Sequence, residues 1–474
     1  MASNSNIEVA VVMVPFPEYG HQTPFLHLSH LIASYDIPVH YVSIGARNHE
    51  LKLRQQAGYQ LFPNIQFHDL SIPENSSSTE KEEEYLSYLE SLNLLGGPLG
   101  DICRALLLSS CRRVVVIHDS IMLSVVQGMI SVANAETYIF HVISAFTVCS
   151  LFHQVRGNDD DQDDDQHLLF LPFQAHLPSM DSCYKPEMPE FVKILRRWTF
   201  KSGDIFNTCR DIEGPYLDAL AKQSDRPIWS LGPLINNVHI VHNNQESSSS
   251  SSSSPNKILS RHRCIEWLDK KPKNSVIYVS FGTVTTFSPE QINELALGLE
   301  RSNQNFIWVL REKDKKGNDV MTEKDVSKTK LPAGLEERVG ERGIIAREWV
   351  PQLEILGHPA TGGYLFHSGW NSFLESVTVG VPMATWPIHS DNPFNDVLIT
   401  KVLKVGVVVR EWTHKDELVR SNTIENAVRT LMTSPEGEEM RQRALDLSQA
   451  IKISGRDGGA TKKQAESFIA HITR

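Results

Sequence analysis

Residues 349–395 read WVPQLEILGHPATGGYLFHSGWNSFLESVTVGVPMATWPIHSDNPFN. Gly, Pro, Ser and Asn separate three short apolar runs, residues 363–366, 373–377 and 381–386. Apolar runs separated by turn-forming residues in this way predict a strand, a turn, a helix and a second strand. In the turn, Gly369 would let the backbone approach a ligand closely, and Asn371 or Ser372 could cap the helix. The N–H groups at such a helix start can bind a diphosphate.

Two further features of this stretch suit a nucleotide. Glu375 follows the turn by about one helical turn, where a carboxylate could accept hydrogen bonds from ribose hydroxyls. Trp349 precedes Pro351 and Gln352 and offers a flat face on which a base could stack. A single tryptophan such as Trp349 or Trp370 more often belongs to a core than to a ligand site. It is the combination of these residues in this order along the chain, which we call the ordered set, that favours a ligand site.

The ordered set resembles, almost position by position, the signature box of plant UDP-sugar-dependent glycosyltransferases, which is their donor site. The resemblance implies that Trp349 stacks on uracil, with the backbone of Val350 and with Gln352 beside it. It implies that Glu375 holds the ribose. The residues implied for the phosphates are His367, Gly369, Asn371 and Ser372, and those implied for the sugar are Trp370, Asp391 and Asn392.

One position departs from the pattern of the resembled family. Glucosyl-transferring members usually have Gln at the last position of the box, where this chain has Asn392, one methylene shorter. Because its side chain is shorter, Asn392 could contact the sugar hydroxyls only in a narrower pocket. The choice between UDP-glucose and UDP-xylose therefore stays open. Ser368 stands where Cys is common, a change that we expect to be nearly neutral.

Length and composition limit the possible classes of protein. A chain of 474 residues is too long for one ordinary domain and suits two of about 200 each. Apolar residues make up 41% of the chain, enough for two cores. The net charge of −11, without a concentrated basic patch, argues against nucleic acid as a partner.

The compartment can also be inferred from the sequence. We find no signal peptide, and no run approaches the roughly 20 apolar residues of a membrane-spanning helix. Animal relatives of the resembled family carry a membrane anchor, so its absence favours a cytoplasmic enzyme without membrane insertion. The six cysteines are scattered without a C-x-x-C pair, which indicates reduced thiols rather than disulfides or a metal site. We expect a monomer.

The first half of the chain begins with a β–α unit. Residues 7–14 form a continuous apolar, β-branched run, typical of a central parallel strand. A loop of Pro and Gly residues that ends at His21 follows, and then apolar residues recur at helical spacing from Phe25 to Ile32. Similar runs alternate with helical patterns further on, which predicts an α/β fold. These runs are residues 38–44, 65–68, 114–117, 137–141, 204–208, 228–230, 275–281, 306–310 and 405–409.

A run of eight serines, residues 247–254, indicates the boundary between two domains, because serines cannot pack a core. The sequence thus divides into an acceptor domain (residues 1–245), a linker (246–257), a donor domain (258–455) and a last helix (456–474). The resemblance implies that this helix packs back on the first domain. It also implies the GT-B fold, two doubly wound Rossmann-like domains that face each other across a cleft.

Two other polar stretches have competing interpretations. Residues 157–167 include six aspartates, which could bind a metal ion, but blocks of like charge are more often solvated loops, and we predict no metal site. The strand at residues 275–281 leads into Gly282 and Thr283. The resemblance implies that these two residues touch the diphosphate, whereas the simpler interpretation is a strand-ending turn.

His21 is the candidate general base. It lies after the carboxyl end of the strand at residues 7–14, and ligands bind at the carboxyl ends of such strands. Its ordinary pKa near 6.5 suits proton abstraction near neutrality. Asp119 stands at the end of a later predicted strand, in the run of residues 114–119, and could orient and stabilise the imidazolium. Asp119 could equally be a helix N-cap for Ser120 onward. In the resembled family, the catalytic His and its Asp partner occupy these positions.

The resemblance covers essentially the full length of the chain. Several segments, among them PFPEYGHQTPFLHLSHLIA (residues 15–33) and EWLDKKPKNSVIYVSFGT (266–283), resemble zeatin O-glucosyl- and O-xylosyltransferases. The implied activity is transfer of a sugar, with inversion and without a metal or other cofactor, from a UDP-sugar to a hydroxyl of a small molecule such as a zeatin-type cytokinin. Phenolic or terpenoid acceptors are the alternative within this class. A UDP-sugar epimerase or a non-catalytic UDP-sugar-binding protein is the alternative from another class.

Overall fold

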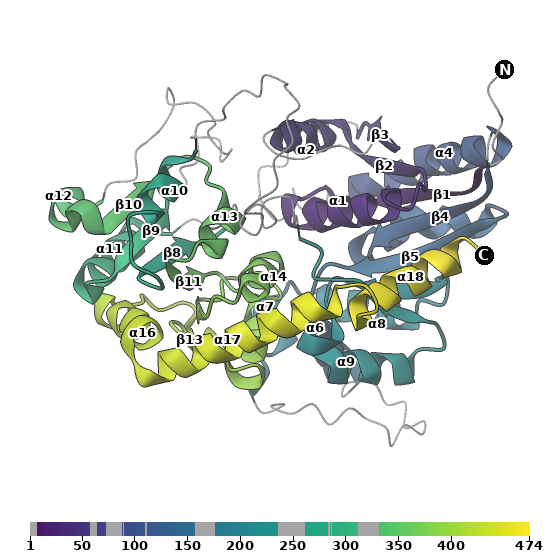
Figure 1. Cartoon of the computed structure of the whole chain (residues 1–474). Helices are drawn as coiled ribbons and strands as arrows, with labels where there is room; N and C mark the ends of the chain where they lie inside the picture. Colours follow the sequence, from purple (N-terminus) through teal and green to yellow (C-terminus); the bar gives the residue numbers. More distant parts are fainter. Residues whose placement is uncertain are drawn as a thin grey trace, which may run out of the picture. The chain divides into compact units, whose positions relative to one another are not determined.

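Parallel strands form both sheets of the protein, which we describe from a computed structural model (Figure 1). The structure describes residues 7–56, 64–72, 88, 90–109, 111–156, 176–235, 261–282, 285, 287–310 and 331–474. These residues group into two units. Unit 1 takes its residues from 1–169, 187–236 and 454–474, and unit 2 from 170–186 and 237–453.

The sheet of unit 1 has seven strands in the order β3-β2-β1-β4-β5-β6-β7. The order reverses between β1 and β4, so the loops that follow these two strands diverge at the carboxyl edge and leave room for a ligand there. The strands are β1 (Ile7–Val14), β2 (Val39–Ile44), β3 (Ile65–Leu70), β4 (Cys111–Asp119), β5 (Ala135–His141), β6 (Gly203–Phe206) and β7 (Ile228–Ser230).

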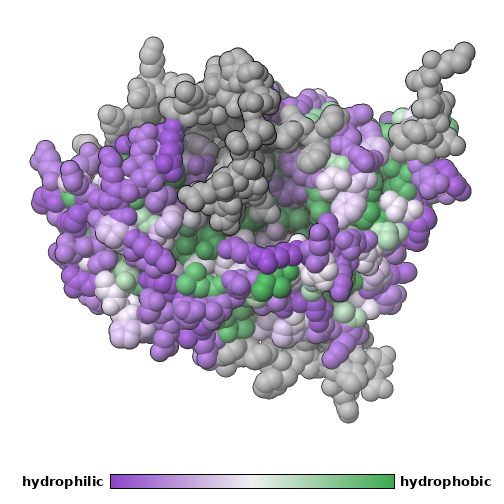
Figure 2. All heavy atoms as spheres, in the orientation of Figure 1, coloured by the Kyte–Doolittle hydropathy of each residue, from purple (hydrophilic) through white to green (hydrophobic). Residues whose placement is uncertain are grey.

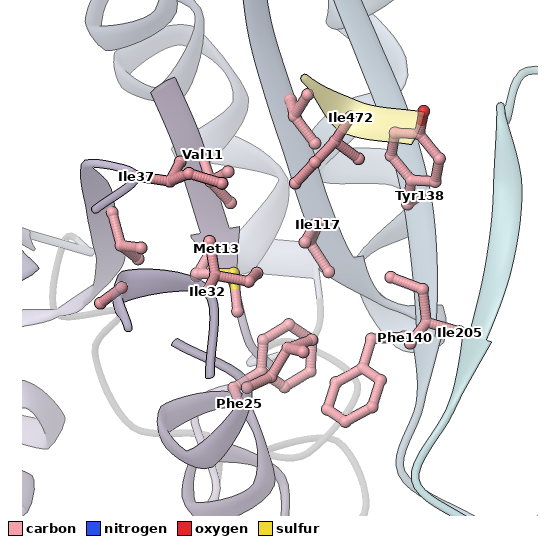
Figure 3. Packing of buried hydrophobic residues seen from close by; sticks show 14 of the residues in the cluster. Val11, Met13, Phe25, Ile32, Ile37, Ile117, Tyr138, Phe140, Ile205 and Ile472 are labelled. Carbon is pink, nitrogen blue, oxygen red and sulfur yellow. The ribbon is translucent and has the colours of Figure 1, made fainter. Parts of the chain in front are cut away.

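Helices accompany this sheet, and the buried β-branched and aromatic side chains of the strands pack against them. In one core cluster, Val11 and Met13 of β1 lie with Phe25 and Ile32 of the first helix and with Ile472 at the end of the chain (Figure 3). The helices are α1 (Tyr19–Ala33), α2 (Gly45–Gln56), α4 (Gly96–Ser109), α5 (Leu123–Val126), α6 (Ala145–Arg156), α8 (Met188–Arg197), α9 (Arg210–Gln223) and α18 (Ala460–Ile472). The C-terminal helix α18 therefore contributes to the core of unit 1.

The sheet of unit 2 has six strands in the order β10-β9-β8-β11-β12-β13, with a reversal between β8 and β11. The strands are β8 (Val276–Ser280), β9 (Asn305–Val309), β10 (Gly343–Ala346), β11 (Thr361–Phe366), β12 (Met383–Thr385) and β13 (Gly406–Val408). The α-helices are α7 (Met180–Cys183), α10 (Arg263–Leu268), α11 (Pro289–Ser302), α12 (Leu335–Val339), α13 (Gln352–Gly357), α14 (Trp370–Val379), α15 (Asn392–Val397), α16 (Ser421–Thr433) and α17 (Pro435–Ser454).

The predicted alternation of strands and helices is confirmed, since each predicted strand has its counterpart within a few residues. The division of the chain differs at one segment. The sequence division places residues 176–186 in the first domain, whereas contacts group them with unit 2. The physical reason is that Ser182 and Cys183 form hydrogen bonds with Trp412, Lys415 and Ser390. The serine run and the aspartate run lie outside the described residues.

Hydrophilic residues cover most of the visible described surface of each unit (Figure 2). All six cysteines are free thiols, five of them buried and Cys183 partly buried, as predicted. No described helix combines the length and the apolar character that crossing a membrane requires.

Candidate active site

His21 and Asp119 lie in direct contact at the carboxyl edge of the first sheet. β1 and β4 are neighbours, with Val14 beside His118, so the end of β4 lies next to the loop that follows β1. The Nδ1 atom of His21 is 2.7 Å from Oδ2 of Asp119. The side chain of His21 is 22% exposed and that of Asp119 is fully buried. This contact agrees with the expectation that strand ends of one parallel sheet lie side by side.

The position of His21 differs from the prediction in one respect. The sequence predicts that it ends a loop, but α1 begins at Tyr19, so His21 lies in the first turn of that helix. Pro15 and Pro17 end the strand, and nothing in the residues after Pro17 opposes a helix until Pro24. A helical backbone holds the imidazole more firmly than a loop would. The ring of Phe16 also packs edge-on against it, with 5.1 Å between centroids.

The contacts of Asp119 fit both interpretations that the sequence left open. Its Oδ1 accepts a hydrogen bond from the backbone N–H of Ile121 at 3.0 Å, so it caps the short 3-10 helix Ser120–Met122. Its Oδ2 faces His21. Burial by itself would raise the pKa of Asp119, but the facing imidazole and these hydrogen bonds lower it below its ordinary value. The ionised carboxylate accepts from Nδ1–H, which leaves the imidazole lone pair on Nε2.

The predicted donor residues of unit 2 gather around the turn between β11 and α14. Ser368 has a left-handed backbone (φ 64°), and Gly369 is the N-cap of α14. The prediction that Asn371 or Ser372 caps this helix is wrong, because the chain already enters the helix at Trp370. The N-cap residue, Gly369, has no side chain with which to cap α14. The start of a helix is a place where backbone N–H groups and the helix dipole favour an anion.

His367 lies between two glycines. A Cβ on Gly282, whose φ is 77°, would lie 3.1 Å from Cε1 of His367, and a Cβ on Gly369 would collide with the imidazole. The strand-ending turn after β8 thus meets the turn after β11. Burial lowers the pKa of His367 to about 4, so this imidazole is neutral and can donate one hydrogen bond. Thr283 lies outside the described residues.

Gln352, Ser372 and Glu375 form one hydrogen-bonded group. The Nε2 atom of Gln352 donates to Oε2 of Glu375 at 2.6 Å and lies 3.2 Å from Oγ of Ser372. Glu375 is partly exposed, yet desolvation raises its pKa to about 7, against the opposing effect of the hydrogen bond from Gln352. Residues predicted for the uracil (Gln352), the ribose (Glu375) and the phosphates (Ser372) are therefore adjacent in space.

The two tryptophans of the box have opposite surroundings. Trp349 is 57% exposed, as a stacking platform must be, and Val350 beside it is buried. Trp370 is only 4% exposed and stacks on Phe373 with 4.9 Å between centroids. The core interpretation therefore fits the packing of Trp370, and the platform interpretation fits that of Trp349.

Asp391 and Asn392 hold their own loop together. The Oδ1 atom of Asn392, a residue 2% exposed, lies 3.3 Å from the backbone nitrogen of His389. Asp391 accepts from Asn395 at 2.8 Å, and the Nδ2 atom of Asn395 is 3.0 Å from the carbonyl oxygen of Ser368. The loop assigned to the sugar is thus tied to the turn assigned to the phosphates.

Comparisons with known proteins identify the family of the chain. The N-terminal glycosyltransferase domain matches residues 7–236, and the domain described as "UDP-glucoronosyl and UDP-glucosyl transferase" matches residues 238–452. The chain is 42% identical to zeatin O-xylosyltransferase of Phaseolus vulgaris, over 100% of both chains. It is also 42% identical to zeatin O-glucosyltransferase of Phaseolus lunatus, over 98% of this chain and 97% of that protein. The chain belongs to the UDP-dependent glycosyltransferase family.

Solved structures give the same family fold. Medicago truncatula UGT71G1, in complex with UDP-glucose, matches with a TM-score of 0.77 and 25% identity over 100% of both chains. Phytolacca americana UGT2 matches with a TM-score of 0.77 and 22% identity over 98% of this chain and 100% of that one. The two parallel-sheet α/β units of this glycosyltransferase are those of the GT-B fold, as predicted.

Three residues of this glycosyltransferase were not anticipated from the sequence. The hydroxyl groups of Tyr278 and Tyr364 each lie 3.2 Å from Oε1 of Gln352, which fixes the orientation of that amide. Asn395 links Asp391 to Ser368, as described above. For the two tyrosines, the available signal was a Tyr inside a predicted buried strand, because a buried hydroxyl needs a partner. Among the described residues, no group of three or more His, Cys, Asp or Glu side chains forms a metal site in this glycosyltransferase.

Proposed function

We propose that this UDP-dependent O-glycosyltransferase moves glucose or xylose, with inversion, to a hydroxyl of a zeatin-type cytokinin. The assignment of the acceptor rests on similarity to two zeatin O-glycosyltransferases, one named for glucose and one for xylose. The chain is 42% identical to each of them over nearly whole chains. Because the relatives differ in their sugar, both UDP-glucose and UDP-xylose are candidate donors.

The reaction is a single displacement. The acceptor oxygen attacks the anomeric carbon while the bond from that carbon to the UDP oxygen breaks, and UDP leaves with the electron pair. The acceptor proton passes to Nε2 of His21. Asp119, ionised and fully buried, holds Nδ1–H and stabilises the imidazolium that forms.

The donor residues hold UDP and receive its developing charge. Trp349 stacks on the uracil, with Val350 and Gln352 beside it, and Glu375 accepts hydrogen bonds from the ribose. The phosphates lie at the start of α14, where N–H groups and the helix dipole favour an anion. The residues assigned to the phosphates are Gly282, Thr283, His367, Gly369, Asn371 and Ser372, and those assigned to the sugar are Trp370, Asp391 and Asn392.

A donor and acceptor screen tests this proposal. The purified protein is incubated with UDP-glucose or UDP-xylose and with zeatin, a phenol or a terpenoid alcohol, and released UDP is measured. We expect UDP release only when an acceptor is present, fastest with zeatin, and a product of inverted anomeric configuration by NMR. Faster turnover of the phenol or terpenoid would replace the zeatin assignment. Isomerisation of the UDP-sugar without acceptor would indicate an epimerase, and binding without turnover a non-catalytic protein.

A further inference from the structure

A short piece of chain from well before the donor box packs against the sugar end of that box. Residues 179–184, which we call the α7 segment, include α7 (Met180–Cys183) and group with unit 2. The chain continues from them into α8, which belongs to unit 1. The signature box that begins at Trp349 contains no residue of this segment.

The α7 segment contacts the backbone of the loop that carries Asp391 and Asn392. The N–H group of Ser390 donates to the carbonyl oxygen of Cys183 at 3.2 Å. Ser390 has a left-handed backbone, with φ 55°. This conformation is unfavourable for a non-glycine residue, so contacts from outside the loop help to hold it. The backbone of Ser390 sets the direction in which Asp391 and Asn392 leave it.

The α7 segment is itself anchored from the other side. The indole Nε1–H of Trp412 donates to Oγ of Ser182 at 2.8 Å. The ammonium group of Lys415 donates to the carbonyl oxygen of Ser182 at 2.7 Å and lies 4.7 Å from the centroid of the Trp412 ring. Ser182 therefore receives two donors from one turn of unit 2.

The segment at residues 410–415 also contacts the beginning of the loop that carries Asp391 and Asn392, residues 387–392. Arg410 donates to the carbonyl oxygen of Lys415 at 2.9 Å and to that of Pro387. Residues 387–392 are thus supported at one end by Arg410 and near the other by Cys183. The ring of Tyr184 adds an apolar contact, with its centroid 6.4 Å from that of Phe394, just after the loop.

We propose that the α7 segment is a positioning element for the donor sugar, which acts by holding Ser390 and so aiming Asp391 and Asn392. The inference rests on the proposed function, because these two residues are assigned to the sugar there. Ser182 and Trp412 are positioning residues, since neither is assigned a contact with the donor. The contacts of the α7 segment given above reach Ser390, Phe394, Trp412 and Lys415, whereas the residues assigned to uridine and phosphate lie mainly on α13, α14 and the turns beside them.

Separate measurement of UDP and UDP-sugar affinity tests the inference. Ser182→Ala and Trp412→Phe both remove the hydrogen bond between Trp412 and Ser182, and Ser182→Ala also removes the bond from Oγ of Ser182 to the carbonyl oxygen of Ser179. In each variant we expect the Kd and KM of UDP-glucose and UDP-xylose to rise about fivefold or more. The Kd of UDP, which lacks the sugar, should stay within about twofold by the same arithmetic. Ser182→Thr keeps the acceptor hydroxyl and should restore the affinity of the UDP-sugar.

A second background tests the role of the Ser390 backbone. Glycine adopts a positive φ without steric cost, so in Ser390→Gly the loop depends less on its support. We expect Ser182→Ala to raise the Kd of UDP-glucose by less than about twofold in that background, compared with about fivefold in the wild-type background. An undiminished effect would contradict the proposed route through Ser390.

Matched controls come from unit 1, where Trp229 donates from Nε1 to Oγ of Ser467 at 3.4 Å. Trp229→Phe and Ser467→Ala remove the same kind of pair and should leave the ratio of UDP-glucose to UDP affinity unchanged. The inference is overturned if Ser182→Ala and Trp412→Phe weaken UDP and UDP-glucose equally, or weaken neither. A wild-type protein that transfers no sugar would overturn the proposed function itself.

Discussion

The Nδ1 atom of His21 lies 2.7 Å from Oδ2 of Asp119, although 98 residues separate them in the chain. The contact follows from the strand order, since β1 and β4 are neighbours and each residue follows the carboxyl end of its strand or stands at it. It gives His21 a fixed tautomer and a buried counter-charge, which are the properties that a general base needs.

Replacement of His21 by Ala removes the proposed base. We expect kcat to fall by about 10²–10⁴-fold, the contribution typical of general-base catalysis, while the Kd of UDP stays unchanged. Initial rates with zeatin and calorimetry with UDP measure the two quantities. His49→Ala, an exposed histidine on α2, is the control and should be fully active. Near-normal turnover of His21→Ala would exclude His21 as the base.

The two functions of Asp119 can be separated by two substitutions. Asparagine keeps an oxygen that can cap the helix at Ile121, but its amide would donate to Nδ1 and place the imidazole proton on Nε2, the wrong nitrogen. We expect Asp119→Asn to lose about a hundredfold or more in kcat with little loss of stability. Asp119→Ala should lose similar activity and also about 1 kcal/mol of unfolding free energy, because the cap is gone. Urea unfolding and initial rates distinguish these outcomes.

The sequence predicted the sheets well because parallel strands are buried on both faces. In an α/β protein, continuous apolar runs such as residues 7–14 and 275–281 fit few elements besides a central strand. Helix starts were harder to predict. Asn371 and Ser372 are good capping residues by propensity, yet the backbone of Ser368 and Gly369 places the start of α14 earlier. Polar propensity indicates that a cap is near, and tertiary contacts decide which residue occupies it.

Other parts of the site depend on packing that no local pattern encodes. Trp349 and Trp370 are equivalent as sequence features, but one is 57% exposed and the other 4%. The support of Gln352 by Tyr278 and Tyr364 requires the register of β8 against β11, which places these two tyrosines side by side. The anchoring of residues 179–184 requires a chain path that sequence composition does not reveal.

Trp349 offers a test of base stacking that leaves the fold unaffected. Because its side chain is 57% exposed, Trp349→Ala should change the melting temperature little. Stacking on one base contributes about 1–3 kcal/mol, so we expect the Kd of UDP to rise about 10-fold or more, and Trp349→Phe to retain most of the affinity. The affinity for inorganic pyrophosphate, which has no base, should be unchanged. An equal loss of affinity for UDP and for pyrophosphate would mean that Trp349 stabilises the structure of the site and does not stack on the base.

The raised pKa of Glu375 predicts a pH dependence of donor binding. Desolvation raises this pKa to about 7, and the ribose hydroxyls require the ionised carboxylate as acceptor. Below pH 7 the free protein holds a proton on Glu375 that must leave on binding, so the affinity for UDP-glucose should fall as the pH decreases, by up to about tenfold per pH unit. Above about pH 8 it should be constant, because the carboxylate is already ionised.

Glu375→Gln removes the titrating group and keeps the size of the side chain. UDP-glucose is the appropriate ligand, since its diphosphate is esterified at both ends and keeps its charge over this pH range. We expect the variant to bind more weakly than the wild type at pH 8, with a Kd that does not change between pH 5.5 and 8.5. Calorimetry at each pH measures both proteins. A wild-type affinity that is flat over this range, or a variant that keeps the wild-type slope, would show that another group controls the binding of the donor.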